Sequence, residues 1–147
     1  MSIYVFVYGT LRRGECNDLA RVAAQAGLPP PRPAGPARVP GTLVDFGDWP
    51  GLLPAAGGHG VRGELYEVDP ALLPLMDEIE EYTPGTPSCF VRRETVAQTA
   101  AGPVACLYYP IDPDFRAHAC GIDGDDWIAY RLRRDAGHCA SPGKDPA

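Results

Sequence analysis

The chain has 147 residues, of which 45% are hydrophobic and 22% charged, so it has room for one compact core and not for two. Lys and Arg number 13 against 19 Asp and Glu, and the resulting net charge of -6 disfavours nucleic acid as a partner. Gly and Pro number 17 each, which predicts many turns and short helices. We expect one domain over residues 1–134.

The first half of the chain predicts one buried strand, one short helix and a connector. Residues 3–8 are β-branched and aromatic and do not alternate with polar residues, which indicates a strand buried on both faces. Over residues 17–26, apolar residues recur at helical spacing, with Asn17 or Asp18 as the cap. Residues 28–40 contain six prolines, so we expect an extended surface connector that belongs to neither a helix nor a sheet.

The second half predicts further strands and two more helices. Strand-like runs cover residues 42–46, 61–68, 90–98 and 104–109. A helix is predicted from Pro70 to about Tyr82, and another over residues 125–133. Residues 135–147 are small and polar, which is typical of a disordered tail. These elements indicate an α+β fold, a small mixed β-barrel flanked by two or three short helices.

Cysteine and histidine spacing argues against metal. The five cysteines are widely scattered and contain no Cys-x-x-Cys pair, which favours neither a zinc site nor a full disulfide framework. His59, His118 and His138 lack a ligand partner at short spacing, so we expect no metal. Residues 1–8 have no basic leader, and their apolar run is too short for a membrane span. We expect no membrane association and a reducing compartment, the cytoplasm.

Residues 8–14 form the first candidate site. The buried strand ends at Gly9 and continues into a polar loop bounded by Gly14, so several backbone N–H groups have no partner in a ladder. Such N–H groups, with the Thr10 hydroxyl nearby, can bind a carboxylate or a phosphate. The alternative is a plain turn to the surface in which Arg12 and Arg13 are solvated. The spacing alone leaves both interpretations open.

The predicted helix from Pro70 carries four carboxylates, and one of them differs from the rest. On a helical wheel, Asp77, Glu78 and Glu81 lie opposite the apolar arc, whereas Glu80 lies only about 70° from its centre. Partial burial raises the pKa of a carboxyl group and suits it to acid–base chemistry near neutral pH. The alternative is a glutamate whose methylenes pack on the core while its carboxylate reaches water.

Four motifs in the same order resemble the γ-glutamylcyclotransferase-like family, which includes the γ-glutamylamine cyclotransferases and AIG2-like proteins. They are VFVYGTLRRG at residues 5–14, VRGELYEV at 61–68, MDEIEEY at 76–82 and GDDW at 124–127. The resemblance covers residues 3–132. It implies a small β-barrel with flanking helices around a cavity. Matched residue by residue, it implies that Tyr8, Gly9, Thr10 and Leu11 bind substrate and that Glu80 is catalytic.

The resemblance also implies a reaction. The α-amine of a γ-glutamyl group attacks its own γ-carbonyl and closes a ring, which releases 5-oxoproline and a free amine. In this scheme the loop amides of residues 9–11 hold the α-carboxylate, and Glu80 acts first as a base and then as an acid. The donor to the carbonyl oxygen is either a backbone amide or a tyrosine such as Tyr109. The partner is a small γ-glutamyl molecule, and neither metal nor cofactor is needed.

The sequence departs from the family pattern at four places. Met76 stands where a leucine is frequent, which is a tolerated exchange. Glu81 stands where a glycine is common, Asp18 stands where a histidine is frequent, and Asp126 is inserted before Trp127. The motifs do not identify the amine that is released, because loops such as residues 45–60 and 81–88 would shape the part of the cavity that holds it.

Two alternatives from other functional classes remain. The first is a non-catalytic module that binds a γ-glutamyl or other small carboxylate ligand. The second treats the proline-rich residues 28–40 as a docking strip for a protein partner.

Overall fold

The structure is a computed structural model, and it describes residues 3–47, 49–54, 60–83, 85, 89–112, 120–122 and 124–139. The strands are β1 (Ile3–Val7), β2 (Arg32–Val39), β3 (Thr42–Asp45), β4 (Pro50–Leu53), β5 (Val61–Val68), β6 (Arg93–Thr99), β7 (Gly102–Tyr108) and β8 (Cys120–Gly121). The helices are α1 (Leu19–Gln25), a 3₁₀ turn (Pro70–Leu72) that leads into α2 (Leu73–Ile79), and α3 (Trp127–Cys139).

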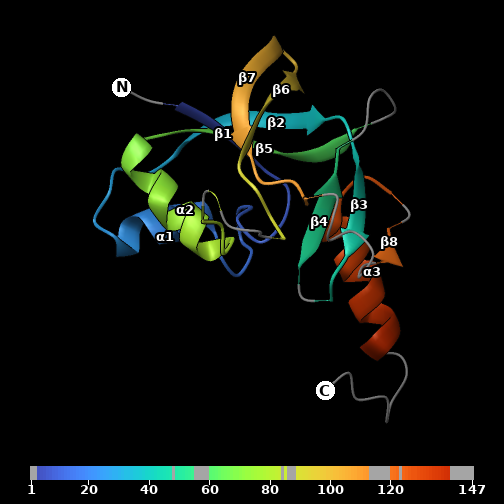
Figure 1. The fold of residues 1–147 in the computed structure, drawn as a ribbon. Coiled ribbons are helices and arrows are strands. Elements are labelled where there is room, and N and C mark those ends of the chain that lie inside the picture. The colour runs from blue at the N-terminus through green and yellow to red at the C-terminus, as the bar shows by residue number, and fades with distance from the viewer. Residues whose placement is uncertain are drawn as a thin grey trace.

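The predicted mixed barrel is confirmed. Five strands close in the order β1-β5-β2-β6-β7, and a separate sheet has the order β4-β3-β8. The barrel is mixed because β1 runs parallel to β7 where the barrel closes, while the other barrel pairs are antiparallel. In Figure 1, α1 and α2 lie together on one side of the barrel, and the β3–β4 hairpin lies with α3 on the other.

Strand β1 is buried on both faces, as its continuous apolar run predicts. Val5 and Val7 point to one core cluster, which they share with residues of α1 and α2. Phe6 points to the opposite cluster, which contains β5 residues and Trp127 at the start of α3. Because β1 separates two packed layers, neither of its faces meets water. Its C-terminal end therefore opens into the interior of the molecule.

The prediction for residues 28–40 is wrong. Strand β2 pairs antiparallel with β5 along its length, with a register shift between Pro33 and Gly35, and meets β6 at Arg38 opposite Gln98. A strand tolerates proline where the missing N–H would point to a side without a ladder partner. Because the pairing with β6 is short, β2 offers such positions. Because most of this segment is paired as a barrel strand, the structure does not support the alternative in which residues 28–40 dock a protein partner.

The predicted C-terminal tail also needs correction. Helix α3 continues to Cys139, so residues 135–139 are helical rather than disordered, and residues 140–147 lie outside the described part of the chain. Arg131 and Asp135 form an ion pair one helical turn apart. Arg134 binds Asp45 of β3. These contacts stabilise the C-terminal part of α3. The contact between Arg134 and Asp45 joins residues far apart in the chain, so local sequence does not predict it.

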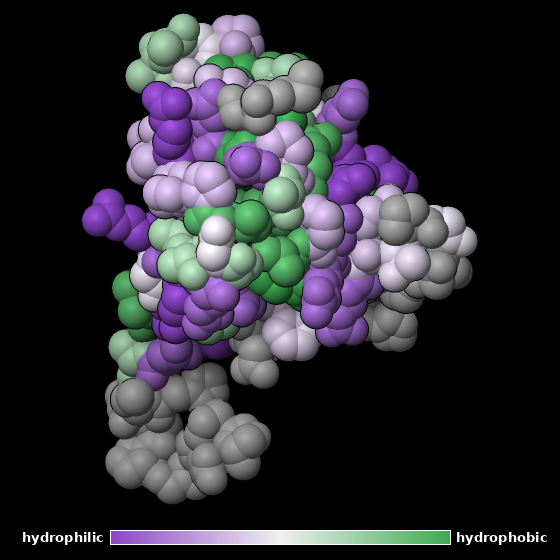
Figure 2. Space-filling model, turned by 90° about the vertical axis from the view of Figure 1, so that its left-hand side faces the viewer, coloured by the Kyte–Doolittle hydropathy of each residue, from purple (hydrophilic) through white to green (hydrophobic). Residues whose placement is uncertain are grey.

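Besides β2, the structure adds two strands that the sequence did not predict, β4 and β8. Strand β4 is short and begins with Pro50 and Gly51, both typical of turns. Its strand conformation depends on pairing with β3 and on the burial of Leu52. Within the described residues, no helix is both long and apolar enough to cross a membrane. Viewed over α1 and α2, hydrophobic surface gathers in the middle of the face between hydrophilic margins (Figure 2).

Candidate active site

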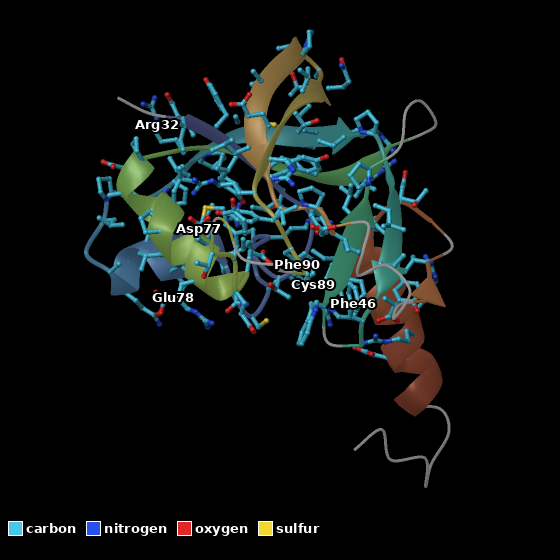
Figure 3. The ribbon with its side chains drawn as sticks, viewed as in Figure 1. Arg32, Phe46, Asp77, Glu78, Cys89 and Phe90 are labelled. Carbon is cyan, nitrogen blue, oxygen red and sulfur yellow. The ribbon has the colours of Figure 1, made fainter. Side chains whose placement is uncertain are left out.

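A cavity of about 630 Å³ lies between the loop after β1, the end of α2 and the β3–β4 hairpin. It is lined by Phe6, Val7, Tyr8, Gly9, Thr10, Leu11, Cys16, Asn17, Phe46, Trp49, Pro50, Ile79, Glu80, Glu81, Cys89, Phe90 and Tyr109. All five residues singled out by the sequence are thus brought to one cavity. Figure 3 shows Phe46 on the hairpin side, with Cys89 and Phe90 between it and α2.

The loop after β1 turns its carbonyl groups one way and its amides the other. The carbonyl oxygens of Gly9, Thr10 and Leu11 accept hydrogen bonds from the N–H groups of Arg12, Asn17 and Leu19, at 3.0, 2.9 and 3.1 Å. Because the C=O and N–H of a trans peptide point in opposite directions, the N–H groups of Thr10 and Leu11 point away from residues 12–19. Among the described residues these two amides have no hydrogen-bond partner. They form a cradle suited to a carboxylate.

Arg12 holds this loop from behind. Its Nε donates to Glu64 Oε2 at 3.1 Å and its Nη1 to Asp126 Oδ1 at 2.9 Å, and the side chain is only 12% exposed. The interpretation of Arg12 as a solvated residue is therefore wrong. Asp126 also accepts from the N–H of Ile128, so the inserted aspartate caps α3. The sequence gave no signal for this network, because its members are far apart along the chain.

The Tyr8 side chain is fixed at its hydroxyl group. That hydroxyl donates to the carbonyl oxygen of Tyr109 at 2.7 Å and accepts from the N–H of Leu52 at 3.1 Å. Burial is the main reason that the pKa of Tyr8 is raised, and nearby Glu80 raises it further. Tyr8 therefore lines the cavity as a neutral ring that ties β1 to the hairpin strand β4.

Glu80 is placed by the end of α2. The N–H of Tyr82 donates to the carbonyl of Asp77 at 2.8 Å, and the N–H of Glu81 donates to that of Glu78 at 3.1 Å. This pair of bonds is a Schellman motif, which needs a left-handed residue just after the cap. Glu81 occupies that position with φ of 55°, although glycine adopts this conformation more easily. The helix end therefore has the shape that a glycine would give, and Glu80 is its C-cap.

The Glu80 carboxylate faces the cavity without a partner. Among the described residues it has neither an ion pair nor a hydrogen bond, and desolvation by burial raises its pKa to about 8. The other carboxylates of the segment are different: Glu78 is exposed, and Asp77 binds Arg92 Nη1 at 2.7 Å and the Tyr109 hydroxyl at 2.5 Å. The structure thus sets Glu80 apart from the other carboxylates by burial, as the wheel predicts, but the wheel missed that Asp77 forms a structural link.

Tyr109 lines the cavity, yet its hydroxyl hydrogen is directed to Asp77. A tyrosine has one hydrogen to donate, so Tyr109 does not serve as the oxyanion donor in this geometry. Its hydroxyl ties α2 to the residue that follows β7. This contact helps to position the helix end that carries Glu80.

The described part of the chain contains no group of three or more His, Cys, Asp or Glu side chains that could hold a metal ion. His59 and His118 lie outside the described residues. The absence of a metal stays a prediction. The cavity itself combines an amide cradle with one unpaired carboxylate, which can bind an anion and move a proton.

Comparison with known proteins decides the family. A sequence model of the family described as "Gamma-glutamyl cyclotransferase, AIG2-like" matches residues 5–129. The chain belongs to this family. The resemblance drawn from the four sequence motifs is thereby confirmed.

Relatives in the cyclotransferase family cover most of the chain. A γ-glutamylaminecyclotransferase of Rattus norvegicus is 37% identical over 117 residues, which are 72% of this chain and 76% of the relative. A γ-L-glutamyl-butirosin B γ-glutamyl cyclotransferase of Niallia circulans is 36% identical over 136 residues, or 90% and 80% of the two chains. The crystal structure of an AIG2-like protein from Mus musculus matches with a TM-score of 0.63 at 29% identity, over 78% of this chain and 82% of that one.

Proposed function

We propose that this protein cleaves a γ-glutamyl amide by intramolecular attack of the α-amine, which gives 5-oxoproline and a free amine. One observation carries the proposal: an amide cradle for a carboxylate and an unpaired carboxyl group with a pKa of about 8 line the same cavity. The first matches the α-carboxylate of a γ-glutamyl group, and the second matches the proton transfers that the reaction needs.

The cradle accelerates the reaction by restricting the substrate. With the α-carboxylate bound by the amides of Thr10 and Leu11, the short glutamyl chain folds back within a confined space and its amine approaches the γ-carbonyl carbon. Holding two reacting groups of one molecule in an attack geometry removes much of the entropic part of the barrier. Because the substrate supplies the nucleophile, we propose that the protein needs no metal, organic cofactor or covalent intermediate.

Glu80 carries two protons from the α-nitrogen to the leaving nitrogen, one after the other. In its ionised form it removes a proton from the α-ammonium, and the freed nitrogen bonds to the γ-carbonyl carbon. When the bond from that carbon to the departing nitrogen breaks, the proton passes from Glu80 to the leaving nitrogen. The ring nitrogen then gives its second proton to the regenerated Glu80 carboxylate, which passes it to the amine, so that 5-oxoproline forms as a neutral lactam and the amine leaves as an ammonium ion. A pKa of about 8 suits both steps, because proton transfer is most efficient when the pKa of the catalyst lies near the working pH.

The names of the relatives support cyclotransfer as the reaction. One relative is named a γ-glutamylaminecyclotransferase, and another is named for γ-L-glutamyl-butirosin B. We also place the protein in the reducing cytoplasm, which fits the free thiols of Cys16, Cys89 and Cys106. The main alternative, a binding module for a carboxylate ligand, gives no role to the unpaired carboxyl group of Glu80 in the cavity, whereas cyclotransfer uses that group as its proton carrier.

The test is release of 5-oxoproline from a panel of γ-glutamyl amines and peptides by the wild type, Glu80→Gln and Glu78→Gln. Loss of the proton carrier is expected to reduce turnover by about 10²- to 10⁴-fold in Glu80→Gln. Glu78→Gln is the matched control, because that side chain is exposed outside the cavity, and it is expected to retain wild-type turnover.

Two results would contradict the proposal. Full turnover by Glu80→Gln would remove Glu80 from the reaction. If the wild type released no 5-oxoproline while calorimetry detected binding of a γ-glutamyl compound, the protein would be a binding module.

A further inference from the structure

The rim of the cavity has a chemical character of its own. Trp49, at the turn of the β3–β4 hairpin, is 47% exposed, and Phe46 precedes it at the start of that turn. Phe46 meets Phe90 edge to face, with ring centroids 5.9 Å apart. Both labelled rings lie on the hairpin side of α2 in Figure 3. The rim is thus an aromatic wall with one large ring in contact with solvent.

The charge at the rim is negative. Among the described residues that line the cavity, the only ionisable carboxyl groups are those of Glu80, which lies at the inner end with its pKa raised to about 8, and Glu81, which supplies the charge at the rim. Glu81 is exposed, and it follows Glu80 directly in the left-handed position of the α2 end. Neither lysine nor arginine from the described part of the chain lines this space. The wall and the carboxylate together form a surface that attracts cations.

The position of the leaving group follows from the proposed function, on which this inference rests. If the cradle at Thr10 and Leu11 holds the α-carboxylate and Glu80 adjoins the γ-amide, the amine portion extends toward the solvent-exposed rim. There it meets Trp49 and the Glu81 carboxylate. An amino acid or a peptide would bring its own carboxylate to a surface that already carries negative charge.

We propose that the preferred leaving group is an amine with a second, positively charged group on an apolar stem, such as an alkyl diamine or a polyamine. Trp49 packs against the stem and offers its ring face to the cation, and Glu81 pairs with the distal charge. Both residues determine specificity, and neither touches the atoms that react. Binding of the distal charge is electrostatic and lies at an exposed rim, so it weakens as salt is added.

The experiment uses three substrates with the same stem, the mono-γ-glutamyl amides of 1,5-diaminopentane, hexylamine and 6-aminohexanoate. They place a cation, a methyl group and an anion at the same position. We expect kcat/KM to fall in that order, with about tenfold between the cation and the anion, and with the difference mainly in KM. The preference should shrink in high salt. Equal kcat/KM values for the three, or a preference for the anion, would overturn the inference.

Variants test which residues cause the preference for a cationic leaving group. Glu81→Gln is expected to reduce the cation-to-anion ratio about two- to fivefold, the range of an exposed ion pair. Trp49→Ala is expected to raise KM for the cationic substrate about tenfold through the loss of stem packing and ring contact. Glu78→Gln, which removes an equal charge from the outer face of α2, is the control and should leave the ratio unchanged. An equal fall in the ratio for Glu78→Gln and Glu81→Gln would reduce the effect to net charge and overturn the role of Glu81.

The same assay separates this inference from the proposed function. If none of the three substrates releases 5-oxoproline, the proposed function fails and the inference fails with it. If all three release it without regard to charge, the proposed function stands and only the inference fails.

Discussion

The two ends of the cavity are built differently. At the inner end, Arg12 is paired with two carboxylates, the Tyr8 hydroxyl is bound on both sides, and the end of α2 is closed by a Schellman motif. At the rim, α3 holds the hairpin at its base, where Tyr130 and Arg134 bind Asp45, and at its turn, where Arg134 Nη1 donates to the Gly47 carbonyl at 2.6 Å. Both ends are thus tied by hydrogen bonds, and they differ in exposure: the inner groups are enclosed, whereas Trp49 at the hairpin turn is 47% exposed. An enclosed inner site with an exposed rim suits one reaction with different leaving groups.

The largest effect expected at the inner end is a dependence of activity on pH. If ionised Glu80 is the base, its pKa of about 8 predicts that kcat/KM falls about tenfold for each pH unit below that value, or about 100-fold at pH 6. The measurement is 5-oxoproline release at low substrate concentration between pH 5 and pH 9. A flat profile would show that the reaction does not depend on this carboxylate.

The free energy of unfolding should also depend on the ionisation of Glu80, but it should fall as the pH rises, whereas activity should increase. Because the pKa of Glu80 is raised from 4.5 to about 8, the folded state binds its proton more tightly than the unfolded state does. Its stabilising contribution is complete below about pH 4.5 and is lost as the pH rises to 8. Glu80→Gln is therefore expected to be more stable than the wild type at pH 9, by about 2 kcal/mol or more, and closer to it at pH 4. Urea unfolding at both pH values measures the difference.

The next prediction concerns the point where the inner end meets the hairpin. A Cβ at residue 9 would lie 2.6 Å from Cγ and 2.9 Å from Cδ of Pro50, so Gly9→Ala must push the loop and β4 apart. A small displacement of the cradle is expected to reduce kcat/KM about tenfold or more. In the double variant with Pro50→Ala the contact is relieved, and kcat/KM should partly recover. Wild-type activity in Gly9→Ala alone would show that this close approach does not position the cradle.

The last prediction concerns the support behind the cradle. Arg12→Leu leaves Glu64 and Asp126 partly buried without their cation, which is expected to lower the free energy of unfolding by about 1–3 kcal/mol. Arg13→Leu is the matched control, because Arg13 is exposed, and should change it by less than about 0.5 kcal/mol. Equal urea midpoints for the two variants would refute the structural role given to Arg12.

Local patterns predicted a large part of the fold. The continuous apolar run of β1, the strand-like run at residues 61–68 and the helix that starts at Pro70 all depend on near neighbours in the chain, and all three are confirmed. The proline-rich β2 was missed because proline lowers the local preference for a strand, while the ladder with β5 that stabilises it depends on residues far along the chain. The length of α3 was missed for the same reason.

For the candidate site, the sequence by itself determined which residue types stand at the end of β1 and which carboxylate lies near the apolar face of α2. The wheel selected Glu80 because helical geometry is local, and the motifs independently pointed to it. Only the tertiary structure decided that Tyr8 uses its hydroxyl for support, that Asp77 is a link and that Arg12 is an anchor. Arg12 reaches partners 52 and 114 positions away. Such pairs depend on how the barrel closes, and no local pattern contains that information.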